Sequence, residues 1–560
     1  MANKKIFLIL LVILIFAAFL RIYRITEIPP GVNQDEASIG YTAYSLLKTG
    51  SDEYGRLFPI SFESFGDWKL PFYIYLTVPF VALFGLSEFA VRFPSALFGV
   101  ATVFTTYILV VALLKDKKLA LLTSFLVAIA PWHLHFSRVE SESNVAIFFI
   151  TVGMIFLLKS VRDKSWFIIV SFISFALTYF IYAGNHIFTT LLLVGIFFLY
   201  RSFIFHNKHT FYGLTIFIIL TAFILYNTLF IADKVKLSGI NIFGDPATVH
   251  VNIENRRVDH GQSDILGKIF HNKMVFSIEK ITQNYLNAFS PQFLFIQGGT
   301  NKAHNISNFG NMYLIEAIFL LAGFIRLIAI RKSREAKFIL WWFLIAAVPA
   351  SITKDAPHTN RMFAIFPILP LVTGLGIVQT IEWLQESIIK RPLQKIAYGA
   401  LGLFFAFNFI LYVDRYFVHF PRNEGENWGI GYKKLVSFLS QDRFNKKRII
   451  MVNSEQSPYI FLLFYQSYDP FHYQQIVKRY PYTSDGFVHV KSFDRYEFPK
   501  QIDWSQTLRM QNVLIIAPPN YIPESIKNNR TRYNRFVINL SDGETMFVIM
   551  ETKKLTEQDL

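Results

Sequence analysis

Pro29-Pro30-Gly31-Val32-Asn33-Gln34-Asp35-Glu36 is the stretch around which the chain is organised, because it ends the first long apolar segment. Proline lacks the N–H that a helix needs to propagate, and glycine lets the backbone turn. Two carboxylates then follow just outside a predicted membrane span. A carboxylate there is costly without water, a partner charge or a ligand, so the acidic pair suggests a site. The alternative is a helix start, with Asn33 as the cap and Asp35 and Glu36 in the first turn.

Hydropathy predicts a polytopic α-helical membrane protein. Of the 560 residues 53% are hydrophobic and 17% are charged, and the mean hydropathy is +0.36. Lys4 and Lys5 precede an apolar run from Ile6 to Leu20 without a small-residue cleavage site, which predicts an uncleaved first span rather than a signal peptide. The further predicted spans are 94–114, 119–136, 145–158, 166–182, 187–200, 211–231, 312–330, 338–352, 362–383 and 396–413. We therefore expect about eleven transmembrane helices.

The positions of the basic residues predict the topology. Alternate connections are short and basic: 115–118, 159–164, 201–209, 331–337 and 390–395. The positive-inside rule makes them cytoplasmic, so the N-terminus is expected inside and the large loops and the tail outside the cytoplasmic (plasma) membrane. A net charge of +16 would suggest nucleic acid for a soluble protein, but here the charge follows the topology and no nucleic-acid partner is expected.

Two domains are predicted. Residues 1–413 form a transmembrane domain with outer loops at 25–93 and 232–311, and residues 414–560 form a soluble extracytoplasmic domain. Arg448–Val452 and Val513–Ala517 have the composition of buried strands, which predicts a small α/β domain. This domain has no glycine-rich phosphate loop or metal motif, and no chemistry is assigned to it. The chain has no cysteine, which excludes thiol nucleophiles, thiolate metal sites and disulfides.

The first outer loop carries more polar residues at headgroup depth. Ala37–Leu47 is predicted to be an interfacial helix that ends at Gly50. Asp67 and Lys69 then stand in the aromatic stretch Phe65–Leu76. Lys69 at the outer surface suits an anionic lipid phosphate, or it simply snorkels.

Later outer loops offer further candidates. Arg138 and Glu142 are four residues apart, so on a continued helix they share a face and can pair. His133 and His135 point about 200° apart on a helix, which disfavours a shared metal. The polar loop 297–305 contains His304, and the loop 354–361 contains His358 and Arg361. Each of these two loops offers a histidine and a cation at membrane depth.

Three motifs carry a resemblance to a known family: Asp35-Glu36, Gly66-Asp67-Trp68-Lys69-Leu70-Pro71, and Val91-Arg92-Phe93-Pro94-Ser95-Ala96-Leu97-Phe98-Gly99. They resemble the bacterial relatives of protein O-mannosyltransferases and lipid A aminoarabinose transferases (glycosyltransferase family 39), membrane enzymes of the GT-C fold. The likeness continues through Pro131-Trp132, Ser137-Arg138, Glu142, Asn144 and Ala356-Pro357-His358 to Arg361, over roughly the first 430 residues. Many relatives have two prolines after the lysine, whereas this chain has Leu70-Pro71.

The resemblance implies transfer of a hexose or pentose from a polyprenyl phosphate to an acceptor hydroxyl outside the cytoplasmic membrane, with inversion. A phosphate leaving group needs cations but no proton donor, so one carboxylate suffices as general base for the acceptor. By resemblance Asp35 is that base, and Glu36, about 100° away on a helix, is its supporting or acceptor-orienting partner. The other implied site residues are Lys69, His358 and Arg361 for the donor phosphate, Asp67 for Lys69 or the sugar, and Arg138, Glu142, Asn144 and His304 in support.

Two other classes of protein stay open. A flippase or transporter of a lipid-linked sugar would have many spans, but it would place its site near midplane within repeats, and no internal repeat is evident here. A non-catalytic relative that binds polyprenyl lipid is the third possibility. The expected partners are the polyprenyl-phosphate sugar, membrane lipids and an acceptor protein, lipid or glycan. No metal ligand is assigned, and assistance by a divalent cation stays open.

Overall fold

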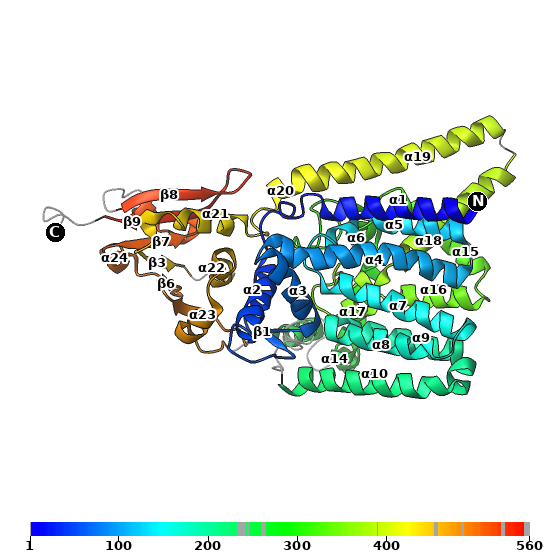
Figure 1. Cartoon of the computed structure of the whole chain (residues 1–560), viewed down its shortest axis with the longest axis horizontal. Helices are drawn as coiled ribbons and strands as arrows, with labels where there is room; N and C mark the ends of the chain where they lie inside the picture. Colours follow the sequence, from blue (N-terminus) through cyan, green and yellow to red (C-terminus); the bar gives the residue numbers. More distant parts are fainter. Residues whose placement is uncertain are drawn as a thin grey trace. The chain divides into compact units, whose positions relative to one another are not determined.

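The computed structural model describes residues 2–231, 242, 246–258, 265–388, 390–452, 457–483, 486–527 and 533–553 (Figure 1). The chain divides into two compact units. The first unit is Met1–Tyr23 with Ser95–Asp414, and the second is Arg24–Pro94 with Arg415–Leu560. The first outer loop therefore groups with the C-terminal part of the chain. The predicted domain boundary at 413/414 stays a prediction, and of the predicted outer loop 232–311 only residues 242, 246–258 and 265–311 are described.

Apolar helices build the first unit (Figure 1). The amino-terminal set is α1 (Ala2–Ile22), α4 (Glu88–Leu114), α5 (Lys117–Ile129), α6 (Pro131–Phe136), α7 (Glu142–Arg162), α8 (Phe167–Ile181), α9 (Gly184–His206) and α10 (Lys208–Tyr226). The later set is α12 (Pro246–Val258), α13 (Ile265–Phe270), α14 (Lys273–Asn287), α15 (Glu316–Ala329), α16 (Arg334–Ile345), α17 (Val348–Ser351), α18 (Ile368–Glu386) and α19 (Arg391–Asp414). The division between the two units falls inside α4, after Pro94.

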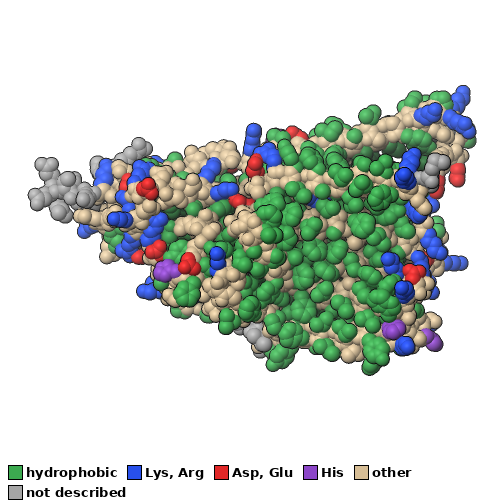
Figure 2. Space-filling view, in the orientation of Figure 1, with side chains coloured by type: hydrophobic (Ala, Val, Ile, Leu, Met, Phe, Trp, Pro, Cys, Tyr) green, Lys and Arg blue, Asp and Glu red, His purple; other side chains and the backbone are tan. Residues whose placement is uncertain are grey.

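The length and hydropathy of these helices make the chain an integral membrane protein. Among the described residues, seven helices are long and apolar enough to cross a membrane, and α8 and α3 (Pro71–Phe84) are shorter apolar helices. Each of the eleven predicted spans overlaps a helix of the structure, and the number of spans stays a prediction. In Figure 2 hydrophobic side chains cover the middle of the first unit, and Lys and Arg side chains gather at the end of its helices near the N-terminus.

The predicted span 119–136 is two helices, α5 and α6, because Pro131 cannot donate an N–H to continue the first. The break leaves carbonyl groups without helical partners. The fully buried Arg21 guanidinium donates to the carbonyls of Val127 (3.3 Å) and Ala128 (3.0 Å) and contacts His133 Nδ1 at 2.8 Å. Arg21 thereby ties the end of α1 to the interrupted helix.

Short elements build the first part of the second unit. α2 (Gln34–Thr49) is followed by a hairpin of β1 (Phe62–Ser64) and β2 (Asp67–Lys69), and then by α3. Asn33 caps α2 in a capping box with Glu36, and Gly50 ends the helix in the left-handed region at φ +70°. The predicted helix at 37–47, its cap and its stop are confirmed.

A seven-stranded mixed sheet forms the rest of the second unit, in the order β4 (Lys478–Arg479), β5 (Val490–Phe493), β6 (Tyr496–Glu497), β3 (Arg448–Met451), β7 (Val513–Ala517), β9 (Thr545–Thr552) and β8 (Tyr533–Asn539). The two strands predicted from the sequence, β3 and β7, are parallel neighbours in it. The helices are α20 (Phe420–Asn423), α21 (Ile430–Leu439), α22 (Tyr459–Gln466), α23 (Pro470–Ile476), α24 (Trp504–Thr507) and α25 (Glu524–Lys527). The α/β character predicted for the tail is confirmed.

Both faces of this sheet are covered, which follows from the alternation of side chains along a strand. Ile449 and Leu514 pack in one cluster with residues of α21 and α22, whereas Ile450 and Ile515 pack in another with Leu508 and its neighbours. The first of these clusters also contains Ala37 and Tyr41 of α2. Residues from the predicted first outer loop are thus part of the hydrophobic core on one face of this sheet.

Candidate functional site

The Asp35 carboxylate and the Lys69 ammonium form an ion pair in the second unit. Asp35 stands in the first turn of α2, and Lys69 is the last residue of β2, opposite Phe62 in the hairpin. The Asp35 side chain is 62% exposed, whereas that of Lys69 is 10% exposed. The pair therefore presents an accessible carboxylate on a largely covered cation.

The neighbouring carboxylate, Glu36, is fully buried and pairs with the fully buried Arg92. Arg92 Nε and Nη2 donate to the two Glu36 oxygens at 2.8 and 2.7 Å. The remaining donors of Arg92 reach the carbonyls of Ile25, Pro29 and Gly31, so its five N–H groups all have acceptors. The Arg92–Glu36 pair fixes the turn that leads into Asp35, and the supporting role of Glu36 stays a prediction.

Asp67 lies in β2 between Gly66 and Lys69, and its side chain is outside the described part of the structure. Its expected role toward Lys69 or a sugar therefore stays a prediction. Gly66 has φ +94°, which a residue with a side chain rarely adopts, and it sets the tight turn of the hairpin.

A second group of candidates lies together in the first unit, in the loop between α17 and α18. Arg361 binds the Asp355 carboxylate and donates to Thr353 Oγ1 at 3.0 Å, and His358 Nε2 lies 3.4 Å from Asp355 Oδ2. Burial and the Arg361 guanidinium lower the pKa of His358 to about 4. Burial raises the pKa of Asp355, but Arg361 and His358 outweigh it and hold that pKa below its usual value. At neutral pH the group therefore consists of a neutral imidazole and one arginine–carboxylate pair.

The structure brings the predicted loop 297–305 against this group. Thr359 Oγ1 donates to Asn305 Oδ1 at 2.6 Å, and the ring centroids of His304 and His358 are 5.1 Å apart. His135, from α6, contacts the carbonyl of Ala303 through Nε2 at 3.0 Å. Two loops predicted to lie outside the membrane, 297–305 and 354–361, thus meet with His135 of α6 in one polar cluster of the first unit.

The remaining supporting candidates lie around the turn between α6 and α7. The continued helix expected there is not formed, since α6 ends at Phe136 and α7 begins at Glu142. Arg138 stands in the intervening turn, is fully buried, and donates to the carbonyl of Leu20 at 2.7 Å. Asn144, also fully buried, donates to the carbonyl of Ser95 at 2.8 Å. Arg138 and Asn144 connect helices, and their part in any reaction stays a prediction.

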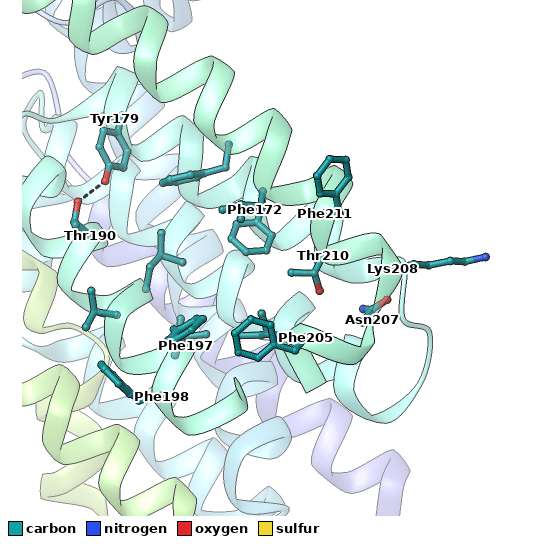
Figure 3. Close-up of a pocket in the computed structure, with 16 residues that line it drawn as sticks. Phe172, Tyr179, Thr190, Phe197, Phe198, Phe205, Asn207, Lys208, Thr210 and Phe211 are labelled. Carbon is teal, nitrogen blue, oxygen red and sulfur yellow. Dashed lines mark hydrogen bonds between the residues drawn. The ribbon is translucent and has the colours of Figure 1, made fainter. Parts of the chain in front are cut away.

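Two cavities of the first unit have largely apolar walls. One of about 740 Å³ lies between α8, α9 and α10, and Figure 3 shows aromatic side chains around it, with the hydroxyls of Tyr179 and Thr190 bonded at 2.6 Å. Another, of about 630 Å³, is lined by residues of α1, α5, α15, α18 and α19. Such walls suit a hydrocarbon chain rather than a phosphate. In the part of the chain that the structure describes, no group of three or more His, Cys, Asp or Glu side chains could hold a metal ion.

Two residues of these groups were missed by sequence reasoning. Arg92 belongs to the Arg-Phe-Pro-Ser string of the family resemblance, but nothing in its spacing pointed to Glu36, 56 residues earlier. Asp355 follows Lys354 in a loop that was recognised as polar, and its being the one carboxylate in the sequence stretch 354–361, which also holds His358 and Arg361, was the signal for it.

Fold and composition define the class, an integral membrane protein with apolar helices in one unit and an α/β sheet in the other. Residues 11–234 match the model of the family described as dolichyl-phosphate-mannose-protein mannosyltransferase. The chain is also similar to ArnT from Cupriavidus metallidurans in the apo state, with 12% identity, 98% of each chain covered and a TM-score of 0.56. No curated protein matches it.

ArnT from the same organism bound to undecaprenyl phosphate gives a similar match, with 12% identity, 98% of each chain covered and a TM-score of 0.54. At this identity the likeness shows the fold, so the GT-C fold expected from the motifs is confirmed.

Proposed function

We propose that this chain transfers a sugar from a polyprenyl-phosphate donor to an acceptor hydroxyl on the outer face of the cytoplasmic membrane, with inversion and with Asp35 as general base. The observation that carries the proposal is the accessible Asp35 carboxylate on the covered Lys69 ammonium, at the first turn after the first span. The family match over 11–234 includes both residues. The fold is also that of ArnT bound to undecaprenyl phosphate, and this likeness supports the donor class.

The reaction needs one base and one or more cations. Asp35 accepts the proton of the acceptor hydroxyl while its oxygen attacks the anomeric carbon. The bond from that carbon to the phosphate oxygen breaks, and the electron pair leaves with the polyprenyl phosphate. Attack from the face opposite the leaving group inverts the anomeric carbon in a single displacement. Lys69 binds the phosphate and stabilises the charge that develops on it.

Both candidate cations already hold a carboxylate, and this sets the order of events. Lys69 binds Asp35, and Arg361 binds Asp355. A donor phosphate that engages Lys69 replaces Asp35 as its counter-ion, and the Asp35 carboxylate, no longer paired with Lys69, then accepts the proton of the acceptor. His358 is neutral near pH 7, so its contribution to phosphate binding is a hydrogen bond rather than a charge. The acceptor class is a protein, a lipid or a glycan.

The experiment compares Asp35→Asn with the wild type in nanodiscs, with a panel of radiolabelled polyprenyl-phosphate sugars and a membrane extract as acceptor. Donor consumption and labelled product are measured together. Glu27→Gln is the matched control, because Glu27 is another exposed carboxylate of the same loop that pairs with a neighbouring cation, Arg24. We expect at least about a hundredfold loss of transfer in Asp35→Asn with donor still bound, and none in the control.

Transfer by Asp35→Asn at the rate of Glu27→Gln would remove Asp35 from the chemistry and leave it as a helix-start residue. Lipid-linked sugar that crosses the bilayer without transfer would favour the flippase class. Donor binding without either event would favour the non-catalytic relative.

A further inference from the structure

Residues 415–553 of the second unit are here called the sheet domain. This domain contacts both elements that carry the Asp35–Lys69 pair, α2 and the β1–β2 hairpin. Asp35 and Lys69 are 34 residues apart and stand on different elements, α2 and the β1–β2 hairpin. An ion pair between side chains on separate elements is maintained only when something fixes the two backbones. The contacts of each element identify what fixes it.

The sheet domain holds the start of α2. The hydroxyl of Tyr465, in α22, is hydrogen-bonded by the Val32 N–H at 3.1 Å. A side chain on Gly31 would stand 2.5 Å from the Trp428 carbonyl oxygen, and one on Gly429 would stand 2.4 Å from the Val32 carbonyl oxygen. The backbone just before Asp35 therefore lies directly against residues 428–430, without room for any side chain between them.

The helix itself is packed against the same domain. A side chain on Gly40 would stand 2.6 Å from the Phe464 ring, and Tyr41 donates to the Tyr468 carbonyl at 3.2 Å. At the far end of α2, Gln474 Nε2 donates to the Asp52 carbonyl at 2.8 Å and lies 3.2 Å from Ser45 Oγ. α2 is thus held along its whole length.

A different part of the sheet domain holds the hairpin. The Val488 N–H donates to the Phe65 carbonyl at 3.2 Å, and a side chain on Gly66 would stand 2.2 Å from the Gly486 carbonyl oxygen. The Tyr482 hydroxyl donates to the Glu63 carboxylate at 2.8 Å. The turn and the first strand of the hairpin are therefore in direct contact with Tyr482, Gly486 and Val488.

We infer that the sheet domain is the positioning part of the site: it fixes the separation of Asp35 and Lys69, with Tyr465 as a positioning residue for Asp35 and Tyr482 as one for Lys69. The inference rests on the proposed function for its catalytic meaning, but the positioning itself can be measured without turnover. It gives a reaction-related role to a domain that carries no phosphate loop or metal motif of its own.

The test uses the absence of cysteine in the full-length chain. The double substitution Asp35→Cys and Lys69→Cys removes the ion pair, so only the scaffold keeps the two positions together. A short bifunctional methanethiosulfonate reagent then reports their proximity by the rate of intramolecular cross-linking in nanodiscs. Tyr465→Phe and Tyr482→Phe are added singly and together. Tyr521→Phe is the control, because Tyr521 is an exposed tyrosine of the same domain.

Each tyrosine substitution removes one hydrogen bond, which corresponds to about a fivefold shift of the local equilibrium. We expect the rate of cross-linking to fall by about that factor in each single variant and further in the double variant, with no change for Tyr521→Phe. In chains that keep Asp35 and Lys69, Tyr465→Phe should lower kcat, whereas Tyr482→Phe should raise KM for the donor. Thermal unfolding of each variant checks that the fold is retained.

The outcomes separate the inference from the proposed function. If the chain that carries both Tyr465→Phe and Tyr482→Phe cross-links at the same rate as the Tyr521→Phe control, the inference is overturned, whether or not sugar transfer changes. Slower cross-linking with normal transfer supports the positioning and overturns the catalytic role of the pair. Slower cross-linking together with the kcat and KM changes supports both.

Discussion

Glu36→Gln tests the buried fork that holds the turn before Asp35. The substitution keeps the shape of the side chain but removes the counter-ion of Arg92, whose guanidinium is fully buried. Removing one partner of a buried ion pair costs about 3–5 kcal/mol, because the other charge stays buried without compensation. Since about 1.4 kcal/mol corresponds to a tenfold change, the local opening constant of this region should rise more than about a hundredfold.

Hydrogen exchange followed by mass spectrometry in nanodiscs measures this opening directly. The reporting amides are those at the start of α2, where the N–H of Glu36 donates to the Asn33 side chain and that of Ala37 donates to the Asn33 carbonyl. Protection of a peptide that covers 32–50 should fall in Glu36→Gln, while that of α7 in the first unit should not change. The matched control is Glu27→Gln, which removes an exposed pair with Arg24 and should cost no more than about 1 kcal/mol.

Equal exchange in Glu36→Gln and Glu27→Gln would refute the reasoning, because loss of the buried ion pair would then cost no more free energy than loss of the exposed one. Equal loss of protection in α7 would also refute it, since the substitution would then act on the whole chain rather than on the turn.

Three further predictions concern pH and backbone space. The pKa of His358 is lowered from 6.5 to about 4, so the unfolded chain binds the extra proton first, and stability should fall as pH decreases from about 6.5 to about 4; thermal unfolding of His358→Gln should show a smaller slope there. Burial raises the pKa of Glu53 from 4.5 to about 7 despite Arg479, so stability should fall as pH rises from about 4.5 to about 7, and Glu53→Gln should reduce that loss. Gly31→Ala should lower the melting temperature by several degrees, because Gly31 has φ +81° and no space for a Cβ, whereas Gly402→Ala, with nothing within 4 Å, should not.

Much of the fold could be predicted because its signals are local. Apolar runs of sufficient length predicted the helices, and the two apolar, β-branched runs predicted the neighbouring strands β3 and β7. The signal at Asn33 was local too, since a capping box lies within four residues. These predictions needed no knowledge of what packs against each segment.

The turn between α6 and α7 shows where a helical spacing rule does not apply. The shared face expected for Arg138 and Glu142 required one helix through both residues, which is not formed, and their pairing stays a prediction. Ser141 instead caps a new helix, its hydroxyl accepting from the Asn144 N–H at 3.2 Å. Residues four apart share a face only within one helix, and Ser141, which caps a new helix, lies between Arg138 and Glu142.

The sequence predicted which loops carry the candidate site residues, but not which of these residues are in contact. The sequence placed His358 and Arg361 in one loop and His304 in another, but their contact depends on how the loops fold, which no spacing rule describes. The grouping of residues 24–94 with the C-terminal sheet could not be predicted for the same reason. The contacts that create it, such as Val32 to Tyr465, join residues more than four hundred positions apart.

Asp35 and Glu36 show what the structure adds to a pair of equal residues. Both are acidic, adjacent and in the first turn of α2, so residue type and spacing do not distinguish their roles, which the sequence assigned only through the family resemblance. A helix turns about 100° per residue, which directs one carboxylate to solvent and Lys69 and the other to the buried Arg92. A general base must reach the acceptor, whereas a carboxylate that fixes the turn must keep its ion pair when the acceptor binds. Stability should therefore respond to Glu36→Gln and transfer to Asp35→Asn, and a reversal of these two effects would exchange the roles of the pair.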